Sequence, residues 1–346
     1  MRVLVSVVCG LMLTACGNAE PKQLNPDSVI KGVSYVGTSV ADLDQSTEFY
    51  RAADLVPVDD RELSGSAAFD KLANRSGVVV QTRMLRSVNA QIRLMQFSDS
   101  SALNATEPVP VQGPGIAHMC YQVDHATGAY QDFLDRGAEI IGDPDLLQIN
   151  PRNPVYYGYV KDLDGAVVEI EHIDVEKLNL PEPPKNKYRV RHVSLSTPDI
   201  DRIVAFYSAL LDEPKPRRVG GANGIGNEAM SGVSGLEGSK VRMAWFQVRN
   251  LELEIFQYAS HPTELPAQPR TLDAVGYNMI VFDVEDLSAA QEQFVAAGGT
   301  IETEPEQMDG GEIVFGRDPD GNLIGLQQAP ADAVISAKNF SGNGME

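Results

Sequence analysis

One strand-and-helix pattern recurs four times along this chain, and the repetition limits its fold more than any other feature. Each copy begins with six residues whose second, fourth and sixth side chains are mostly apolar, at 35–40, 118–123, 192–197 and 279–284. Side chains alternate across a strand, so this apolar set packs inward while the other set faces elsewhere. The repetition predicts a fold assembled from four similar modules.

A helix is predicted directly after the first strand of each module. Asp42 and Asp199 are residues that cap helix starts, and glycines that can end a helix follow in the second and fourth modules, at Gly137 and Gly298. Apolar residues then recur at helical spacing, as at Ile200, Ile203, Tyr207 and Leu210. These helices are expected to cover one face of the sheet.

Each module closes with a further strand, at 90–97, 166–172, 251–257 and 323–328. In the second and fourth modules a turn rich in aspartate and glycine leads into it, in which glycine supplies a positive φ and aspartate caps the turn. Such a turn is common by itself. Its recurrence at one place in two modules supports the repeat.

The N-terminus predicts export. Arg2 precedes an apolar stretch at 3–13 that is too short to span a bilayer, as in a signal peptide. The following Leu-Thr-Ala-Cys-Gly resembles a bacterial lipobox, which implies a signal peptide at 1–15, a diacylated Cys16 and a polar tether over 16–30. The alternative is an ordinary signal peptide. The expected location is a bacterial membrane, with the protein lipid-anchored and facing the periplasm, and two acyl chains suffice for stable anchoring.

Charge and cysteine usage exclude two further features. The formal net charge of −20 argues against nucleic acid as a partner, because binding to phosphates relies on clustered lysine and arginine. Cys9 leaves with the signal peptide and Cys16 is lipidated, so only Cys120 remains and no intramolecular disulfide can form. Core packing must hold the fold together.

The modules group into two tandem domains. The first spans 31–175 and contains modules 31–98 and 115–175, and the second spans 188–329 and contains modules 188–260 and 274–329. A proline-rich linker at 176–187 separates them. The tail at 330–346 has no hydrophobic periodicity and is expected to be disordered.

The strand at 192–197, the helix start at 199–207 and the Asp-Pro-Asp-Gly-Asn turn at 318–322 resemble the vicinal-oxygen-chelate superfamily, which contains glyoxalases, bleomycin resistance proteins and dihydroxybiphenyl dioxygenases. The resemblance extends over 31–329. It implies an α+β fold of four βαβββ modules, paired into cupped mixed sheets with helices outside. It also implies that metal ligands come from the first residue of the first strand and from a glutamate in the last strand of each module.

The two central modules carry suitable residues at these positions. The four predicted metal ligands are His118 and Glu169 in the second module and His192 and Glu254 in the third. Two imidazole nitrogens and two carboxylate oxygens suit a divalent metal, and zinc, nickel, cobalt, manganese and iron all accept such donors. The expected cofactor is therefore one divalent ion of unassigned identity.

The two outer modules offer no ligand pair. The corresponding positions hold Tyr35 and Arg93 in the first module and Met279 and Gly325 in the fourth. This asymmetry favours pairing of the second module with the third, because together they supply all four ligands. A four-module glyoxalase I is thought to pair its modules in this way. The rival pairing, first with second and third with fourth, would leave two half-sites of one His and one Glu each.

Five further candidates receive no metal role. His125, His172 and His261 fall on a predicted helix start, the opposite face of a strand and a loop. Glu171 and Glu252 lie two residues from ligand positions on the same strand face. They could support the ligands, but solvated rim positions are favoured for both.

The resemblance implies chemistry on a small substrate with two neighbouring oxygens. A six-coordinate metal with four protein ligands keeps two positions open for these oxygens and stabilises negative charge on them. A glutamate that leaves the metal can remove a proton next to a carbonyl, which leads to isomerisation or epimerisation. The family motif assigns this base to Glu169, with Glu254 as the symmetric alternative, so a glyoxalase- or epimerase-like isomerase or lyase is expected.

Two other functions remain open. An extradiol-type dioxygenase needs two histidines and one carboxylate, but in that group the third and fourth modules supply all three, and here the fourth offers Met279 and Gly325. A non-catalytic protein that sequesters a small ligand in the same cupped sheet is the other alternative. Metal content would separate the binding protein from the enzymes.

Overall fold

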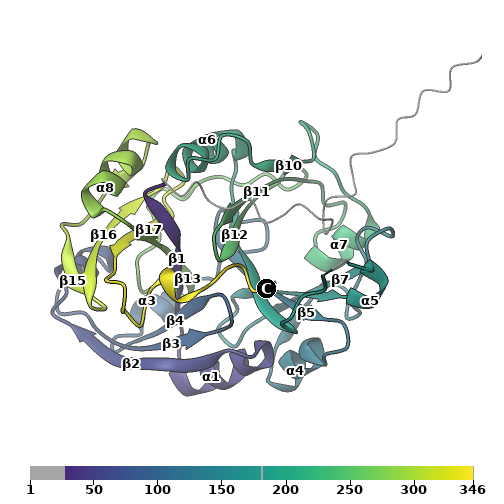
Figure 1. The fold of residues 1–346 in the computed structure, drawn as a ribbon, viewed down its shortest axis with the longest axis horizontal. Coiled ribbons are helices and arrows are strands. Elements are labelled where there is room, and N and C mark those ends of the chain that lie inside the picture. Colours follow the sequence, from purple (N-terminus) through teal and green to yellow (C-terminus); the bar gives the residue numbers. More distant parts are fainter. Residues whose placement is uncertain (1–27, 181, 346) are drawn as a thin grey trace, which may run out of the picture.

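The chain folds into two mixed sheets that stand back to back (Figure 1). The computed structural model describes residues 28–180 and 182–345. The predicted signal peptide at 1–15, the lipidation site Cys16 and most of the tether at 16–30 lie outside the described residues. Among the helices that the structure describes, none is long and apolar enough to cross a membrane.

The first two modules follow the predicted order of elements. The first contains β1 (Ile30–Ser39), α1 (Leu43–Tyr50), η1 (Arg51–Ala53), β2 (Val56–Ser64), α2 (Ala67–Leu72), β3 (Val79–Arg86) and β4 (Gln91–Phe97). After α3 (Ser101–Ala105), the second contains β5 (Gly115–Asp124), α4 (Ala129–Asp135), β6 (Glu139–Ile141), β7 (Val155–Lys161) and β8 (Val167–Ile173).

The last two modules repeat this order after a short helix, α5 (Val175–Leu178), at the start of the predicted linker. The third contains β9 (Tyr188–Ser196), α6 (Ile200–Leu210), β10 (Arg217–Val219), α7 (Glu228–Ser234), β11 (Val241–Val248) and β12 (Leu251–Tyr258). The fourth contains β13 (Gly276–Val284), α8 (Leu287–Ala296), β14 (Thr300–Ile301), β15 (Glu306–Met308), β16 (Gly311–Arg317) and β17 (Leu323–Gln328), and η2 (Ala337–Asn339) follows.

The modules pair from the centre of the chain outward. The eight-stranded sheet has the order β10-β11-β12-β9-β5-β8-β7-β6, so the second and third modules meet where β5 and β9 run antiparallel. The nine-stranded sheet joins the first and fourth modules through β1 and β13. The predicted pairing of the two central modules is confirmed. Each sheet therefore takes one module from 31–175 and one from 188–329.

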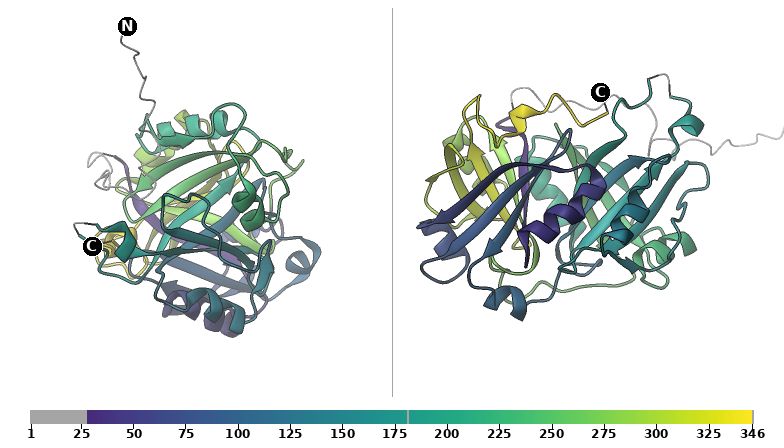
Figure 2. Two further views of the ribbon diagram at one scale, coloured as in Figure 1. Left: turned by 90° about the vertical axis from the view of Figure 1, so that its right-hand side faces the viewer. Right: turned by 90° about the horizontal axis from the view of Figure 1, so that it is seen from below.

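The main hydrophobic core lies between the two sheets. It contains the inward-facing side chains of both sheets together with those of α1, α4, α6 and α8. The helices pack in pairs: the rings of Phe49 and Phe133 lie 5.1 Å apart between α1 and α4, and those of Phe206 and Phe294 lie 5.4 Å apart between α6 and α8. Figure 2 shows α1 and α4 together in the view from below. Each sheet turns its concave face away from this core.

Equivalent hydrogen bonds join two of the helices, α1 and α6, to the aspartate-rich turn of a neighbouring module. The Tyr50 hydroxyl at the end of α1 donates to Asp162 at 2.8 Å, and the Tyr207 hydroxyl in α6 donates to Asp318 at 2.9 Å. All four side chains are buried. The capping prediction also holds, since Asp199 accepts hydrogen bonds from two main-chain amides in the first turn of α6.

The expectation that 330–346 is disordered is wrong for the part that the structure describes. Ile335 and Ser336 are fully buried and Phe340 nearly so, although the segment contains only one short helix, η2. Ser336 donates to the buried Asp283 on β13, and the segment then crosses to the other sheet, where Arg189 reaches the Asn343 carbonyl at 3.0 Å (Figure 1). Irregular backbone packs single side chains without a period, so a periodicity criterion cannot detect it.

Candidate metal centre

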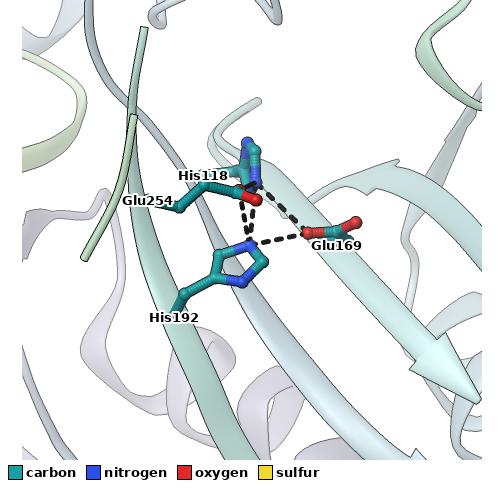
Figure 3. A group of neighbouring side chains, drawn as sticks. All are labelled: His118, Glu169, His192 and Glu254. Carbon is teal, nitrogen blue, oxygen red and sulfur yellow. Dashed lines mark hydrogen bonds and ion pairs between the residues drawn. The ribbon is translucent and has the colours of Figure 1, made fainter. Parts of the chain in front are cut away.

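The four predicted ligand side chains meet on the concave face of the eight-stranded sheet (Figure 3). They come from four adjacent strands: Glu254 from β12, His192 from β9, His118 from β5 and Glu169 from β8. All four are buried, and one ligand atom of each lies within 4.8 Å of the others. The junction of β5 and β9 is thus the centre of the cluster.

The register of β5 and β9 explains why the two histidines meet. His118 lies opposite Ser194 and His192 lies opposite Cys120, so the imidazoles are diagonal neighbours on one face of an antiparallel pair. A β-bulge places Arg191 between two successive pairs of the ladder, Cys120 with His192 and Tyr121 with Val190, and changes the alternation of β9 just before His192. The two Nε2 atoms are 3.2 Å apart.

The carboxylates complete a compact set of four atoms. Oε2 of Glu169 lies 3.2 Å from Nε2 of His118 and 2.8 Å from Nε2 of His192. Oε2 of Glu254 lies 3.4 and 2.9 Å from the same two nitrogens. Both oxygens are buried and have no aligned hydrogen-bond donor. Buried carboxylate oxygens that point toward one position repel each other. A cation bound at that position would offset their charge.

The cluster shifts the pKa values of its members in opposite directions. Burial alone would lower the pKa of His192, but the charge of Glu254 and contact with Glu169 outweigh it and raise the pKa to about 10. The pKa of His118 is also raised, again because two carboxylates outweigh burial. Burial opposes ionisation of the glutamates, yet the histidines lower the pKa of Glu169 to about 2 and lower that of Glu254 as well. A divalent cation would take the place of protons on the imidazoles.

Trp245 on β11 supports one of the two carboxylates, and sequence reasoning missed it. Its Nε1 donates to Oε1 of Glu254 at 2.6 Å, and the guanidinium of Arg217 lies 3.7 Å above its ring. Trp245 is the only tryptophan in the sequence and precedes Glu254 by nine residues, across a short turn. A hairpin register assigned to these two strands would have placed them opposite each other.

The expectation that Glu171 lies at a solvated rim is wrong. Its side chain is fully buried, and its Oε2 lies 2.5 Å from Nη1 of Arg191 and 3.6 Å from Sγ of Cys120. Glu252 is partly exposed and also pairs with Arg191, at 3.2 Å. The bulge at Arg191 brings this cation onto the face of the glutamates, which a regular strand alternation does not predict.

Aromatic side chains line the other end of the cup. The rings of Tyr159 and Phe256 lie 5.2 and 5.9 Å from that of His118, and Tyr258 stacks on Phe256 at 5.6 Å. They belong to an apolar cluster that includes Val233 of α7. The loop after β6 is fastened to α7 by main-chain hydrogen bonding, such as that from the amide at 143 to the carbonyl at 232, at 2.8 Å.

The concave face of the nine-stranded sheet is filled by an ion pair. Nη2 of Arg93 lies 2.5 Å from Oδ2 of Asp309, and its guanidinium lies 4.3 Å above the ring of Tyr35. Arg93, Tyr35 and Met279 are all buried. A Cβ added to Gly325 would lie 2.9 Å from a methyl group of Val281 on the adjacent strand. In the first and fourth modules, buried side chains therefore occupy the position that corresponds to the metal centre.

The three remaining histidines lie outside the cluster. His125 packs edge-on against His172 at 6.0 Å, and the main-chain amide of Tyr130 donates to His172 at 3.3 Å. Burial lowers the pKa of His172 to about 4. His261 contacts the hydroxyl of Ser260 at 2.9 Å in a loop. These contacts account for the three rings without a metal.

Residues 189–326 match the family described as the Glyoxalase/Bleomycin resistance protein/Dioxygenase superfamily. This segment contains His192 and Glu254 of the cluster, while His118 and Glu169 precede it. Comparison with curated protein sequences finds no match.

Solved structures of a glyoxalase I and of a candidate dioxygenase resemble most of the chain. Glyoxalase I from Zea mays superimposes with a TM-score of 0.57 at 15% identity, covering 86% of this chain and 92% of that chain. A single-residue variant of that enzyme gives the same TM-score and coverage at 16% identity. A candidate dioxygenase from Bacillus subtilis subsp. subtilis str. 168 gives 0.55 at 11% identity and 90% of each chain. The chain thus carries a Glyoxalase/Bleomycin resistance protein/Dioxygenase superfamily domain at residues 189–326, and its described residues adopt the tandem glyoxalase fold.

Proposed function

We propose that the whole chain is an exported metalloprotein of the vicinal-oxygen-chelate superfamily that acts as a glyoxalase- or epimerase-like isomerase or lyase. Its substrate is a small molecule with two neighbouring oxygens. The observation that carries this proposal is the convergence of two buried imidazoles and two buried carboxylates from adjacent strands of one sheet. Such a set is costly to bury without a cation, because it leaves charged acceptors without donors.

The donor set defines which residues would hold the metal. His118 and His192 would bind through Nε2, and Glu169 and Glu254 through Oε2, because these are the atoms that converge. Zinc, nickel, cobalt, manganese and iron accept this mixture of nitrogen and oxygen. When bound, the ion supplies Lewis-acid stabilisation of negative charge on two adjacent substrate oxygens.

The carboxylates supply the proton transfer. A glutamate that moves from the ligand position toward the substrate accepts a proton from carbon next to a carbonyl and returns it to the neighbouring carbon. Glu169 and Glu254 are the candidates. Tyr159 and Phe256 beside His118 make this part of the cup apolar, which strengthens electrostatic interactions within it.

Export and anchoring are a separate part of the proposal. Cys16 would carry two acyl chains that attach the protein to a bacterial membrane on its periplasmic side, with no other membrane contact. Metabolic labelling with palmitate tests this: the wild-type chain should take up label and sediment with membranes, and Cys16→Ser should do neither. An unlabelled wild-type chain would show an ordinary signal peptide instead.

Two structural observations favour the isomerase over an extradiol dioxygenase. The third module pairs with the second and not with the fourth, and the centre has two carboxylates where a two-histidine, one-carboxylate iron site needs one. Because the fold is also similar to that of a candidate dioxygenase, consumption of catechol and oxygen must be measured beside isomerase activity.

Metal content of the purified protein is the decisive measurement. We expect about one divalent ion per chain in the wild type and none in a His118→Ala, His192→Ala double variant. A His125→Ala, His261→Ala double variant removes two histidines outside the cluster and should keep the ion. A metal-free wild type after reconstitution would overturn the metal centre and leave a ligand-binding protein.

Activity is then tested with the reconstituted protein. The expected result is exchange of solvent deuterium into the carbon-bound hydrogens of an α-hydroxyketone such as dihydroxyacetone, followed by NMR. Exchange should disappear in the His118→Ala, His192→Ala variant. Oxygen-dependent loss of catechol without deuterium exchange would replace the isomerase with a dioxygenase.

A further inference from the structure

The two carboxylates of the metal centre are held differently. Oε1 of Glu254 accepts the hydrogen bond from Nε1 of Trp245 at 2.6 Å, while its Oε2 faces the cluster. Within residues 28–180 and 182–345, Glu169 has contacts with the two cluster histidines but receives no comparable hydrogen bond from outside the cluster. Glu254 is therefore held by a hydrogen bond from outside the cluster, and Glu169 is not.

The difference arises at equivalent positions of the two central modules. Trp245 lies opposite Glu254 across β11 and β12, and Tyr159 lies opposite Glu169 across β7 and β8. Among the described residues, no hydrogen bond joins the Tyr159 hydroxyl to Glu169, although burial and then the nearby charge of Glu169 raise the pKa of Tyr159. The repeat thus supplies an aromatic neighbour to both carboxylates, and only the indole donates to its carboxylate.

The indole is itself held in place. Arg217 lies opposite Trp245 in the pairing of β10 with β11, and its guanidinium stacks 3.7 Å from the ring centroid. Trp245 is only 9% exposed. A hydrogen bond from a fixed N–H group to a carboxylate is charge-assisted, and its loss would leave a buried donor without an acceptor.

We propose that Trp245 is a positioning residue that keeps Glu254 in the metal's coordination sphere, so that Glu169 is the exchangeable carboxylate. The proposal rests on the metal centre proposed above. Moving Glu254 away from the cluster breaks the bond to Trp245, whereas moving Glu169 breaks no such bond. Glu169 is then the carboxylate that can turn toward a substrate.

Metal affinity tests this with a matched pair of variants. Trp245→Phe removes the N–H group and keeps a smaller ring beneath Arg217, and Tyr159→Phe removes the polar group of the equivalent aromatic residue beside Glu169. Affinity for Co²⁺, measured by competition with a chelator, should fall about 10- to 100-fold in Trp245→Phe, as is usual when a group that orients a ligand is lost. It should change less than about 3-fold in Tyr159→Phe. Equal affinity losses in the two variants would overturn the proposal.

A double-mutant cycle distinguishes positioning from general stabilisation. The affinity loss caused by Trp245→Phe should vanish when Glu254 is already replaced by Gln, and should persist when Glu169 is replaced by Gln. Persistence in both backgrounds would contradict an action through Glu254. A wild type that binds no Co²⁺ would instead refute the metal centre itself.

The single tryptophan provides a measurement that needs no Trp245 variant. In the ¹⁵N-labelled protein, its one indole N–H resonance should be shifted downfield and protected from exchange. Glu254→Gln should move this resonance and reduce its protection, whereas Glu169→Gln should leave both nearly unchanged. An indole signal that responds equally to the two substitutions would overturn the assignment.

Discussion

Asn89 and Asn250 clasp each other's main chain where the two sheets meet. Nδ2 of Asn89 donates to the Asn250 carbonyl at 2.7 Å, and Nδ2 of Asn250 donates to the Asn89 carbonyl at 2.9 Å. Each also bonds both main-chain groups of one residue in a first strand, Val190 for Asn89 and Val33 for Asn250. The two residues occupy equivalent turns of the first and third modules and are fully buried. This clasp fixes the back of the sheet that carries the metal centre.

Replacing Asn89 by Ala should destabilise the fold by about 3 kcal/mol, because it leaves several buried main-chain groups without partners. The free energy of unfolding, measured with urea, gives this value. Val88→Ala changes the adjacent residue, whose side chain is 45% exposed, and should cost less than about 0.5 kcal/mol. A loss in Asn89→Ala no larger than that in Val88→Ala would refute a structural role for the clasp.

Metal should stabilise the protein through the central cluster alone. A ligand that binds only the folded state adds about 2.7 kcal/mol to the free energy of unfolding at about 100 times its Kd. Zn²⁺ should therefore raise the unfolding midpoint of the wild type, and a chelator should reverse the effect. The His118→Ala, His192→Ala variant should not respond. Stabilisation of this variant by Zn²⁺ would place the ion elsewhere.

The buried aspartates of the two recurrent turns predict a pH effect. Burial raises the pKa of Asp162 to about 6, despite the hydrogen bond from Tyr50. In the unfolded chain this carboxyl ionises near its ordinary pKa of 3.8, so between these values the folded state holds a proton that the unfolded state releases. The contribution of Asp162 to stability is therefore present below about pH 4 and is lost as pH rises through 6.

Asp162→Asn removes this titration while preserving the shape of the side chain. Relative to wild type, the variant should become more stable by on the order of 3 kcal/mol as pH rises from about 4 to 7, since one pKa unit corresponds to about 1.4 kcal/mol. Urea unfolding at both pH values measures the difference. A pH-independent difference between Asp162→Asn and wild type would disprove the shift.

The ion pair in the nine-stranded sheet should behave as a structural replacement for a metal site. Among the described residues, Arg93→Met leaves the buried Asp309 with one remaining ion-pair partner, Arg61 at 3.1 Å, and should cost about 3 kcal/mol. Adding Asp309→Asn should recover part of this loss, because it removes the remaining charge. Urea unfolding of the three proteins forms the cycle. Metal content should stay at about one ion per chain throughout, and its loss would show that the two concave faces are not independent.

The candidate centre could be located from the sequence because its determinants are local. A repeat fixes which residues are equivalent, and the alternation of a strand fixes which of them share a face. The resemblance to the vicinal-oxygen-chelate superfamily implies which positions of a module hold metal ligands, and these two rules identify His118, Glu169, His192 and Glu254 at those positions. The pairing of the central modules follows from where the four occur. The structure places all four together.

Groups that depend on register or on irregular backbone could not be found in this way. Trp245 reaches Glu254 only once β11 and β12 are aligned, and Arg191 reaches Glu171 only because of a bulge opposite β5. Neither the alignment of two strands nor a β-bulge produces a periodic pattern in a single sequence. The same limit applies to the C-terminal segment, whose buried side chains are isolated along the chain.

That segment offers two adjacent residues for a direct test. Ile335 is fully buried against the concave face of the nine-stranded sheet, whereas its neighbour Val334 is 51% exposed. Ile335→Ala should lower the free energy of unfolding by about 2 to 4 kcal/mol through lost burial and a residual cavity. Val334→Ala should change it by less than about 0.5 kcal/mol. Because η2 and the contact with Asp283 follow directly after Ile335, the Ile335→Ala variant should also expose the segment to limited proteolysis. Equal stability of the two variants would instead support the disordered tail that the lack of hydrophobic periodicity predicts.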